Sequence, residues 1–288
     1  MTEPSEAASA NLAHWDESVA SHVESYDTAG LAADPTRLTD VVRLDRELMA
    51  PHLPGGSVAG LDLVHLQCHI GTDSISWARL GARVVGVDFS GQAVAAATTL
   101  AAQAGLADRA SFIQADVAGA ASALAGRRFD VVYTSVGVLT WLPELTSWAQ
   151  TIAALLAPGG LFYIREDHPM VYAMAQAAVD GQVSLAFPYF NTGPIVCDEP
   201  FDYTGAVLAH ARTYEWNHSL SEIIGSLLAA GLTIEAFAEY QRADWPYFGS
   251  AMVRDETTPG SWVLPDHPER LPLTFSLAAR ARGLTAGG

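Results

Sequence analysis

The sequence predicts an α/β fold with a mostly parallel sheet, and three observations support this. Short apolar runs that suit buried strands alternate with segments of helical spacing along most of the chain. Residues 63–90 read as strand, tight turn, helix and strand. Asp88 ends the second of these strands, where a nucleotide-binding unit carries an acid about 20 residues after its turn glycine.

The N-terminal segment precedes this unit and has a different character. Residues 1–10 are small, polar and acidic, and we expect a disordered tail there. They show no basic stretch followed by an apolar one, so no signal peptide is expected. Residues 11–56 have helical spacing interrupted at Asp34-Pro35-Thr36, and Pro54-Gly55-Gly56 precedes the first strand. We expect a helical cap over residues 11–56.

The turn of the central unit holds the most informative residues. It reads Gln67-Cys68-His69-Ile70-Gly71 and contains one glycine, so the phosphate fingerprint G-x-G-x-x-G is absent. Side chains at Gln67 or His69 would crowd a pyrophosphate, but they would tolerate an uncharged sugar and an amino-acid tail. The turn therefore points away from NAD and towards S-adenosylmethionine (SAM).

The segment from Val64 to Gly71 resembles the first motif of class I SAM-dependent methyltransferases, L-D-x-G-x-G-x-G. His65 takes the place of the usual acid, and Gln67 and His69 take the places of two glycines. The variant is similar to the L-Q-C-H-x-G motif of a bacterial subgroup. The resemblance implies a Rossmann-like fold with a seven-stranded, mostly parallel sheet and an antiparallel last strand. The alternative is an ordinary Rossmann-like unit that binds another nucleotide.

The remaining elements follow the same pattern, and residues 11–288 are expected to form one methyltransferase domain. Residues 91–105 predict a helix that ends at a glycine. Further strands are expected at residues 110–113, 131–136, 161–167, 232–240 and 272–281. Between them, residues 167–217 are rich in proline and aromatic residues, and we interpret this insertion as a substrate lid.

The resemblance implies a cofactor site at the carboxyl ends of the first strands. Asp88 is expected to bind the ribose, and Asp116 to accept from the adenine amino group, although Asp116 also suits a helix N-cap. Trp15 and Tyr26 could face the cofactor or pack against the sheet. The residues expected to bind the cofactor are Trp15, Tyr26, Gln67, His69, Gly71, Asp73, Asp88, Phe89, Asp116, Val117 and Ser135.

Two residues at the end of the fifth strand are candidates for catalysis. His168 is the first candidate for a general base, and Glu166, two residues away on the same strand face, could orient it or act itself. A structural cap at the strand end is the alternative, and His210 and His218 are further possible bases. Four aromatic residues are expected to bind the substrate: Trp141, Tyr189, Phe190 and Trp216.

Composition narrows the classes of function. The formal net charge of −17 makes nucleic acid an unlikely substrate. The two cysteines, Cys68 and Cys197, form no CxxC pair, which fits a reducing cytoplasm and argues against zinc. The acidic residues show no spacing that is diagnostic of a metal, so none is expected. No apolar run approaches the ~20 residues of a membrane span, and a homo-oligomer is left open.

These observations lead to one functional prediction with two alternatives. We expect SAM-dependent methyl transfer to an O, N or C atom of a small, aromatic or apolar metabolite, in bacterial secondary metabolism by resemblance. One alternative is a SAM-fold binding protein or cyclase that transfers no methyl group. The other is a C-methyltransferase acting on a prenyl-type alkene, for whose diphosphate Arg165, Arg212 and Arg242 are candidate partners.

Overall fold

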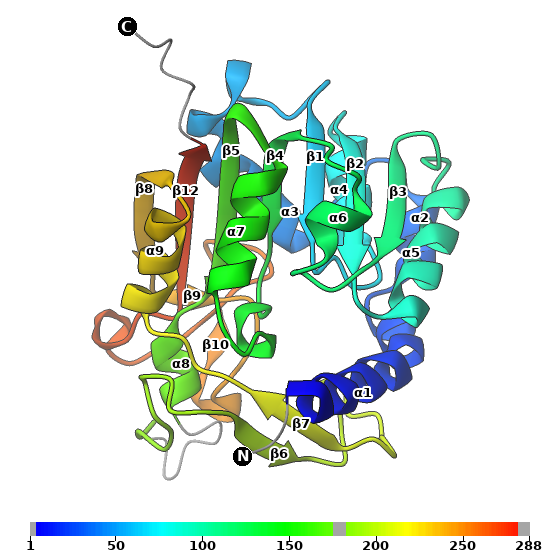
Figure 1. Ribbon diagram of the computed structural model, residues 1–288. Coiled ribbons are helices and arrows are strands. Elements are labelled where there is room, and N and C mark those ends of the chain that lie inside the picture. Colours follow the sequence, from blue (N-terminus) through cyan, green and yellow to red (C-terminus); the bar gives the residue numbers. More distant parts are fainter. Residues whose placement is uncertain (1–3, 175–182, 282–288) are drawn as a thin grey trace, which may run out of the picture.

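The computed structural model describes residues 4–174 and 183–281, and a seven-stranded sheet lies at its centre (Figure 1). The strand order is β3-β2-β1-β4-β5-β12-β8. β12 is antiparallel to both of its neighbours, and the other pairs are parallel. This confirms the predicted fold, including the antiparallel last strand. The strands are β1 (Asp62–Leu66), β2 (Arg83–Asp88), β3 (Ala110–Gln114), β4 (Phe129–Thr134), β5 (Leu156–Asp167), β8 (Leu232–Tyr240) and β12 (Thr274–Ala281).

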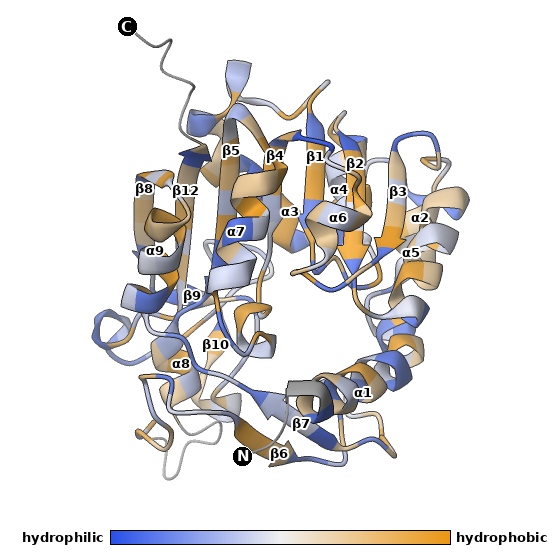
Figure 2. Ribbon diagram, in the orientation of Figure 1, coloured by the Kyte–Doolittle hydropathy of each residue, from blue (hydrophilic) through white to orange (hydrophobic). Residues whose placement is uncertain are grey.

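Helices cover both faces of the sheet, which explains why its central strands are almost continuously apolar (Figure 2). Leu63 and Tyr133 pack with α3, α4 and α5 on one face, whereas Val64 and Phe162 pack with α6, α7 and α9 on the other. The helices are α3 (Asp40–Met49), α4 (Thr72–Arg79), α5 (Gly91–Gln103), α6 (Ala120–Ala123), α7 (Thr146–Leu155) and α9 (Leu220–Ala229). The short 3-10 turns are η1 (Ala50–His52), η2 (Pro54–Gly56), η3 (Leu139–Trp141), η4 (Gly249–Ala251) and η5 (Pro268–Arg270).

The N-terminal segment is helical earlier than expected. α1 (Pro4–Ser25) is followed by the short α2 (Thr28–Ala33), so the prediction of disorder is wrong for residues 4–10. The Asn11 side chain donates to the carbonyl of Tyr214 at 2.8 Å and accepts from the Tyr214 N–H at 2.8 Å. Ala7 packs against Tyr214 and Trp216. These long-range contacts order the first turns of α1, which local composition does not reveal.

The expected lid forms a small layer below the carboxyl ends of the sheet. It contains α8 (Pro169–Ala173) and a two-stranded antiparallel sheet of β6 (Ile195–Asp198) and β7 (Arg212–Glu215). α1 lies along β7 (Figure 1). Residues 175–182 of the predicted lid lie outside the described part.

Residues 241–270, between β8 and β12, also contain short strands. β9 (Arg242–Ala243), β10 (Val253–Arg254) and β11 (Trp262–Val263) form a three-stranded sheet. In the described ranges of the chain, no helix combines the length and hydropathy that a membrane crossing requires.

Candidate functional site

The turn after β1 keeps a glycine-like backbone without the glycines. Gln67 has a φ of 56° and His69 a φ of 48°, both in the left-handed region. For residues with a side chain this conformation costs about 1–2 kcal/mol each. The two residues that replace glycines of the family motif thus preserve its shape at the expense of backbone strain, which is characteristic of a functional turn.

Gly71 has a structural role within the protein, and its role towards a cofactor stays a prediction. Its φ is 78°, and a Cβ atom there would lie 2.8 Å from the Ala97 Cβ and 2.8 Å from the Phe112 Cε1. A side chain at this position would therefore collide with α5 and β3. The close approach that requires glycine here is to the protein's own core.

Asp88 lies beside this turn, as the sequence predicted, and shapes it. Its Oδ2 accepts from the His69 backbone N–H at 2.7 Å, and its Oδ1 accepts from the Ser90 N–H at 3.0 Å. Burial raises the pKa of the Asp88 carboxyl to about 6, although both hydrogen bonds favour the charged form. Each carboxylate oxygen has a second lone pair, so Asp88 can accept further hydrogen bonds from a ligand.

Aromatic side chains from distant segments gather around the same turn. The Trp15 ring lies 5.1 Å from His69 and 5.1 Å from Trp141, measured between ring centroids. The His22 Nδ1 and the His69 Nε2 are 2.7 Å apart, and Tyr203 stacks on His22 at 4.5 Å. Burial lowers the pKa of His22 to about 4 and that of His69 to about 3, so both rings are neutral near pH 7. Trp141, expected on the substrate side, belongs to this cluster.

Three buried polar atoms near the turn make no hydrogen bond within the described residues. One is the His22 Nε2, which lies 3.4 Å from the Asp202 carboxylate. The other two are the Gln67 Oε1, an acceptor, and the Trp15 Nε1, a donor. The Gln67 amide is held in place because its Nε2 donates to the Val138 carbonyl at 3.0 Å. An unpaired buried polar group costs about 1–3 kcal/mol, and a ligand bringing both a donor and an acceptor would remove this cost.

Asp73 and Ser135 meet at the next strand ends. The Asp73 carboxylate accepts from the Thr39 hydroxyl at 2.5 Å and from the Ser135 hydroxyl at 3.2 Å, which ties α3, α4 and β4 together. Burial raises the pKa of Asp73 to about 6. Within the described residues they contact each other and the N-terminal cap, and the Ser135 hydroxyl also lies 3.4 Å from the His65 Nε2. Their role towards a cofactor stays a prediction.

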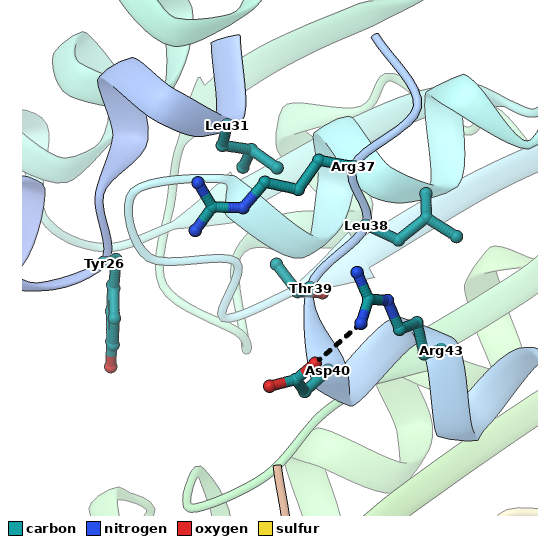
Figure 3. Close-up of a pocket in the computed structure, with 7 residues that line it drawn as sticks. All are labelled: Tyr26, Leu31, Arg37, Leu38, Thr39, Asp40 and Arg43. Carbon is teal, nitrogen blue, oxygen red and sulfur yellow. Dashed lines mark hydrogen bonds and ion pairs between the residues drawn. The ribbon is translucent and has the colours of Figure 1, made fainter. Parts of the chain in front are cut away.

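Tyr26 borders a cavity of about 110 Å³ between the N-terminal segment and the start of α3 (Figure 3). The two guanidinium groups that line it are already paired. Arg37 contacts Asp27 at 2.5 Å, and Arg43 contacts Asp40 at 3.3 Å. Both positive charges at this cavity are therefore already paired with carboxylates.

The residues at the ends of β2 and β3 have mixed environments. Asp116 is exposed and accepts from the Gly119 N–H at 2.6 Å, so it closes the turn before α6 and is not the cap residue of that helix. Val117 belongs to the main core. The Phe89 carbonyl accepts from the Gln114 side chain at 3.1 Å. Their roles in binding adenine stay predictions.

Glu166 is a structural anchor in this structure. It is buried and accepts four backbone N–H groups: Gly137 at 2.5 Å, Asp167 at 2.8 Å, Val138 at 2.9 Å and Leu139 at 3.2 Å. It thereby fixes the loop after β4. The prediction that Glu166 orients His168 is wrong, because its oxygens are directed to these amides.

His168 has the contacts of a cap. Its Nδ1 accepts from the Met170 N–H at 3.1 Å at the start of α8, and its Nε2 lies 2.9 Å from the Glu239 carboxylate. Because Nδ1 accepts, the proton is on Nε2, and a neutral ring has no acceptor left for a substrate. These contacts match the structural alternative and give the proposed base role no support.

The other candidates on the substrate side also have protein partners. His218 uses both ring nitrogens, towards the Leu142 carbonyl at 2.7 Å and Glu222 at 3.0 Å, and His210 bonds to Glu17. Trp216 is buried, and its backbone N–H donates to the Thr140 carbonyl at 2.8 Å. The Tyr189 hydroxyl accepts from the Leu220 N–H at 3.3 Å, while Phe190 is 66% exposed and packs edge-on against Tyr189. Of the four predicted aromatic residues, Trp141 borders the turn and Trp216 a buried cavity.

Asp167 is the residue that sequence reasoning missed. It is buried at the end of β5, and its Oδ2 accepts from the hydroxyls of Tyr172, at 3.0 Å, and Tyr247. Its Oδ1 has no partner in the described part of the chain. The sequence did contain a signal for Asp167. Glu166 and Asp167 are adjacent carboxylates on a strand, and adjacent strand residues face opposite sides of the sheet, so the two side chains could be expected in different surroundings.

The comparisons with known proteins agree with this geometry. Residues 64–162 match the family described as a methyltransferase domain. A ubiquinone biosynthesis O-methyltransferase of Methylobacterium sp. (strain 4-46) is 33% identical over 132 residues, which cover 45% of this chain and 50% of the relative. The chain spans about half the length of the curated relatives that it matches.

Solved structures share the fold at low identity. A SAM-dependent methyltransferase from Mesorhizobium loti is 21% identical with a TM-score of 0.55, over 81% of this chain and 95% of that one. The glycopeptide N-methyltransferase MtfA, complexed with SAM, is 15% identical with a TM-score of 0.53, over 84% of this chain and 94% of that one. The chain therefore has the fold of class I methyltransferases, and its residues 64–162 are similar to a methyltransferase domain.

Proposed function

We propose that the chain is a SAM-dependent methyltransferase that acts on a small molecule. The observation that carries the proposal is the pair of unpartnered atoms at the turn after β1, the Gln67 Oε1 and the Trp15 Nε1. The amino-acid end of SAM brings an ammonium group, which donates, and a carboxylate, which accepts. The residues present fit this group, and Asp88 beside them can accept from ribose hydroxyls.

The surrounding side chains suit a cationic ligand. When bound, SAM supplies a methyl group on a positively charged sulfur. The lowered pKa values of His22 and His69 keep both rings uncharged, so they do not repel this charge. The faces of Trp15 and Trp141 add a surface that attracts cations.

The curated relatives support oxygen as the accepting atom, since they are named as O-methyltransferases. The solved structures of low identity are named for both N- and C-methyl transfer and do not decide the atom. The prenyl-type alternative is less well supported, because each arginine considered for a diphosphate has a partner. Arg165 is buried between Asp45 and Asp244, Arg212 pairs with Asp198, and Arg242 lies over the Tyr240 ring.

The setting of the reaction is part of the same proposal. Both cysteines, Cys68 and Cys197, are free, as expected for a protein of the cytoplasm. The curated relatives are named for ubiquinone biosynthesis, and a role in secondary metabolism rests on the motif variant alone. The substrate and pathway are therefore best identified directly.

Two measurements test the proposed function. Calorimetry with SAM and with S-adenosylhomocysteine (SAH) should show binding of both. Mass spectrometry of a bacterial metabolite extract, incubated with the protein and methyl-labelled SAM, should then show a labelled product. Absence of SAM binding would overturn the proposal, whereas tight binding of SAM and SAH without any labelled product would favour the binding-protein or cyclase alternative.

A further inference from the structure

A small buried cavity lies at the carboxyl ends of β4 and β5, between α8 and the segment that leads into α9. Its volume is about 10 Å³, which is room for one small polar group. The side chains that define its polarity are Asp167, Asn217 and Glu166, and those of Tyr172 and Trp216 form aromatic walls. This place adjoins Gly137 of the loop after β4, where a Cβ atom would lie 3.7 Å from the Asp167 Oδ2.

Asp167 lines this cavity and has an oxygen that no described residue bonds. It is 2% exposed, and two tyrosine hydroxyls bond to its Oδ2, from Tyr172 and Tyr247. Its Oδ1 is buried and has no partner among the described residues. Burial, and next the neighbouring Glu166, raise the pKa of Asp167 well above its ordinary value, so the charged carboxylate is favoured here only when a positively charged donor is bound beside it.

Asn217 presents a second acceptor, and its orientation is fixed. Its Nδ2 donates to the Pro169 carbonyl at 3.0 Å and to the Pro188 carbonyl at 2.9 Å. These two bonds use both amide hydrogens, so a flipped amide would lose them. The Asn217 Oδ1 is consequently held without a partner in the described structure, and water cannot easily replace one because the residue is buried, with 4% of its surface exposed.

Several donors near the cavity are already used. His218 bonds through both ring nitrogens, and the Trp216 backbone N–H donates to Thr140. Two unpaired acceptors in one cavity cost about 1–3 kcal/mol each unless a donor is bound. The Glu166 carboxylate, also buried in the cavity wall, adds negative character and favours a positively charged donor.

We propose that this cavity binds the polar head of the methyl acceptor, and that it selects heads that donate hydrogen bonds: an amine or ammonium group first, a hydroxyl second. The aromatic walls of Tyr172 and Trp216 suit an ammonium group and an adjoining ring. A carboxylate head is excluded, because it would face two acceptors and a buried carboxylate. The inference rests on the proposed function and names the substrate class of its acceptor side.

Wild-type protein saturated with SAH tests the inference with three probes of similar size. Phenethylamine carries an ammonium head, 4-ethylphenol a hydroxyl and phenylacetate a carboxylate. Calorimetry should give the lowest Kd for phenethylamine, a higher one for 4-ethylphenol, and for phenylacetate a Kd at least tenfold above that of phenethylamine. Equal or tighter binding of phenylacetate would overturn the inference. Binding of none of the three would also overturn it and would leave the cavity to a single water molecule.

Asp167→Asn sharpens the test, because the variant keeps an oxygen for the tyrosine hydroxyls and turns an NH₂ group towards the cavity. Its affinity for phenethylamine should fall at least tenfold, and phenylacetate should gain affinity relative to wild type. Asp198→Asn, in an exposed ion pair, is the matched control and should change neither value. An unchanged probe order in Asp167→Asn would overturn the inference; if this variant does not fold, the wild-type order decides.

The SAH titration separates this inference from the proposed function. Loss of SAH binding in wild type would count against the methyltransferase proposal, irrespective of the probes. Normal SAH binding with the wrong probe order would overturn only the assignment of the cavity.

Discussion

The turn after β1 and the end of β5 lie on the same edge of the sheet, and both hold buried polar atoms that lack hydrogen-bond partners among the described residues. At the turn these atoms include a donor and an acceptor, the Trp15 Nε1 and the Gln67 Oε1. At the end of β5 both are acceptors, the Asp167 Oδ1 and the Asn217 Oδ1. The first pair matches a ligand that carries both charges, and the second a ligand that donates. The unpartnered atoms thus differ in kind between the cofactor side and the acceptor side of the proposed site.

The largest expected effect is a loss of stability at the end of β5, where Glu166 is expected to have a structural role. Glu166→Gln should lower the free energy of unfolding by about 3 kcal/mol, because the NH₂ group of glutamine would face two of the four backbone N–H groups that the carboxyl oxygens now accept. Urea denaturation measures this. Glu239→Gln, which changes the half-exposed partner of His168, should cost less than about 1 kcal/mol. A loss below about 1 kcal/mol in Glu166→Gln would show that Glu166 does not anchor the loop.

The two regions also differ in how far the sequence reveals them. The turn is contiguous in sequence, so the sequence alone showed that Gln67 and His69 stand where the family motif has glycines. In the structure both residues have the positive φ that glycine favours. The spacing of Asp88 placed it beside the turn. The seven-stranded, mostly parallel sheet and its antiparallel last strand followed from the family resemblance.

The end of β5 is assembled from residues far apart in the sequence. Glu166 is engaged by the loop after β4, and Tyr247 reaches Asp167 from a loop 80 positions away. Such pairings depend on tertiary packing, and no local pattern encodes them. The same reason explains the error at residues 4–10, whose order depends on contacts with β7.

The pH dependence of cofactor binding probes the turn. The pKa of Asp88 is raised to about 6, so at pH 5 about nine-tenths of it is protonated and cannot accept two ribose hydroxyls. SAH affinity should therefore rise about tenfold between pH 5 and pH 7. Calorimetry across this range should show the rise in wild type and in Asp73→Asn, but not in Asp88→Asn. A slope that persists in Asp88→Asn would assign the titration to another group.

The stability of the free protein should respond to pH with the opposite sign. A carboxyl whose pKa is raised on folding binds more protons in the folded state. The contribution of Asp88 to the free energy of unfolding is then fully present below about pH 4, and it is lost as the pH rises through about 6. Comparing wild type with Asp88→Asn in urea at pH 4.5 and pH 7 isolates this contribution.

Backbone strain and ligand binding at Gln67 are separable. Gln67→Ala and Gln67→Gly both remove the Oε1 atom, so SAH affinity should fall about tenfold in each, as for one hydrogen bond to a charged group. Only glycine relieves the left-handed backbone, so Gln67→Gly should be about 1 kcal/mol more stable than Gln67→Ala. Equal stability of the two variants would contradict the strain, and unchanged affinity would contradict the contact.

The smallest expected effect concerns the donor of the pair. Trp15→Phe should weaken SAH binding about fivefold, the value of one ordinary hydrogen bond of about 1 kcal/mol. Trp141→Phe is the matched control, because the Trp141 Nε1 already donates to the Gly137 carbonyl at 3.0 Å. An equal loss in both variants would indicate a packing effect in place of a hydrogen bond to the ligand.

A structure of the protein with bound SAH tests the central claim most directly. The account predicts that the ligand's ammonium group bonds to the Gln67 Oε1, its carboxylate to the Trp15 Nε1, and its ribose hydroxyls to Asp88. A ligand bound elsewhere, or both unpartnered side chains turned away from the amino-acid end, would contradict the account.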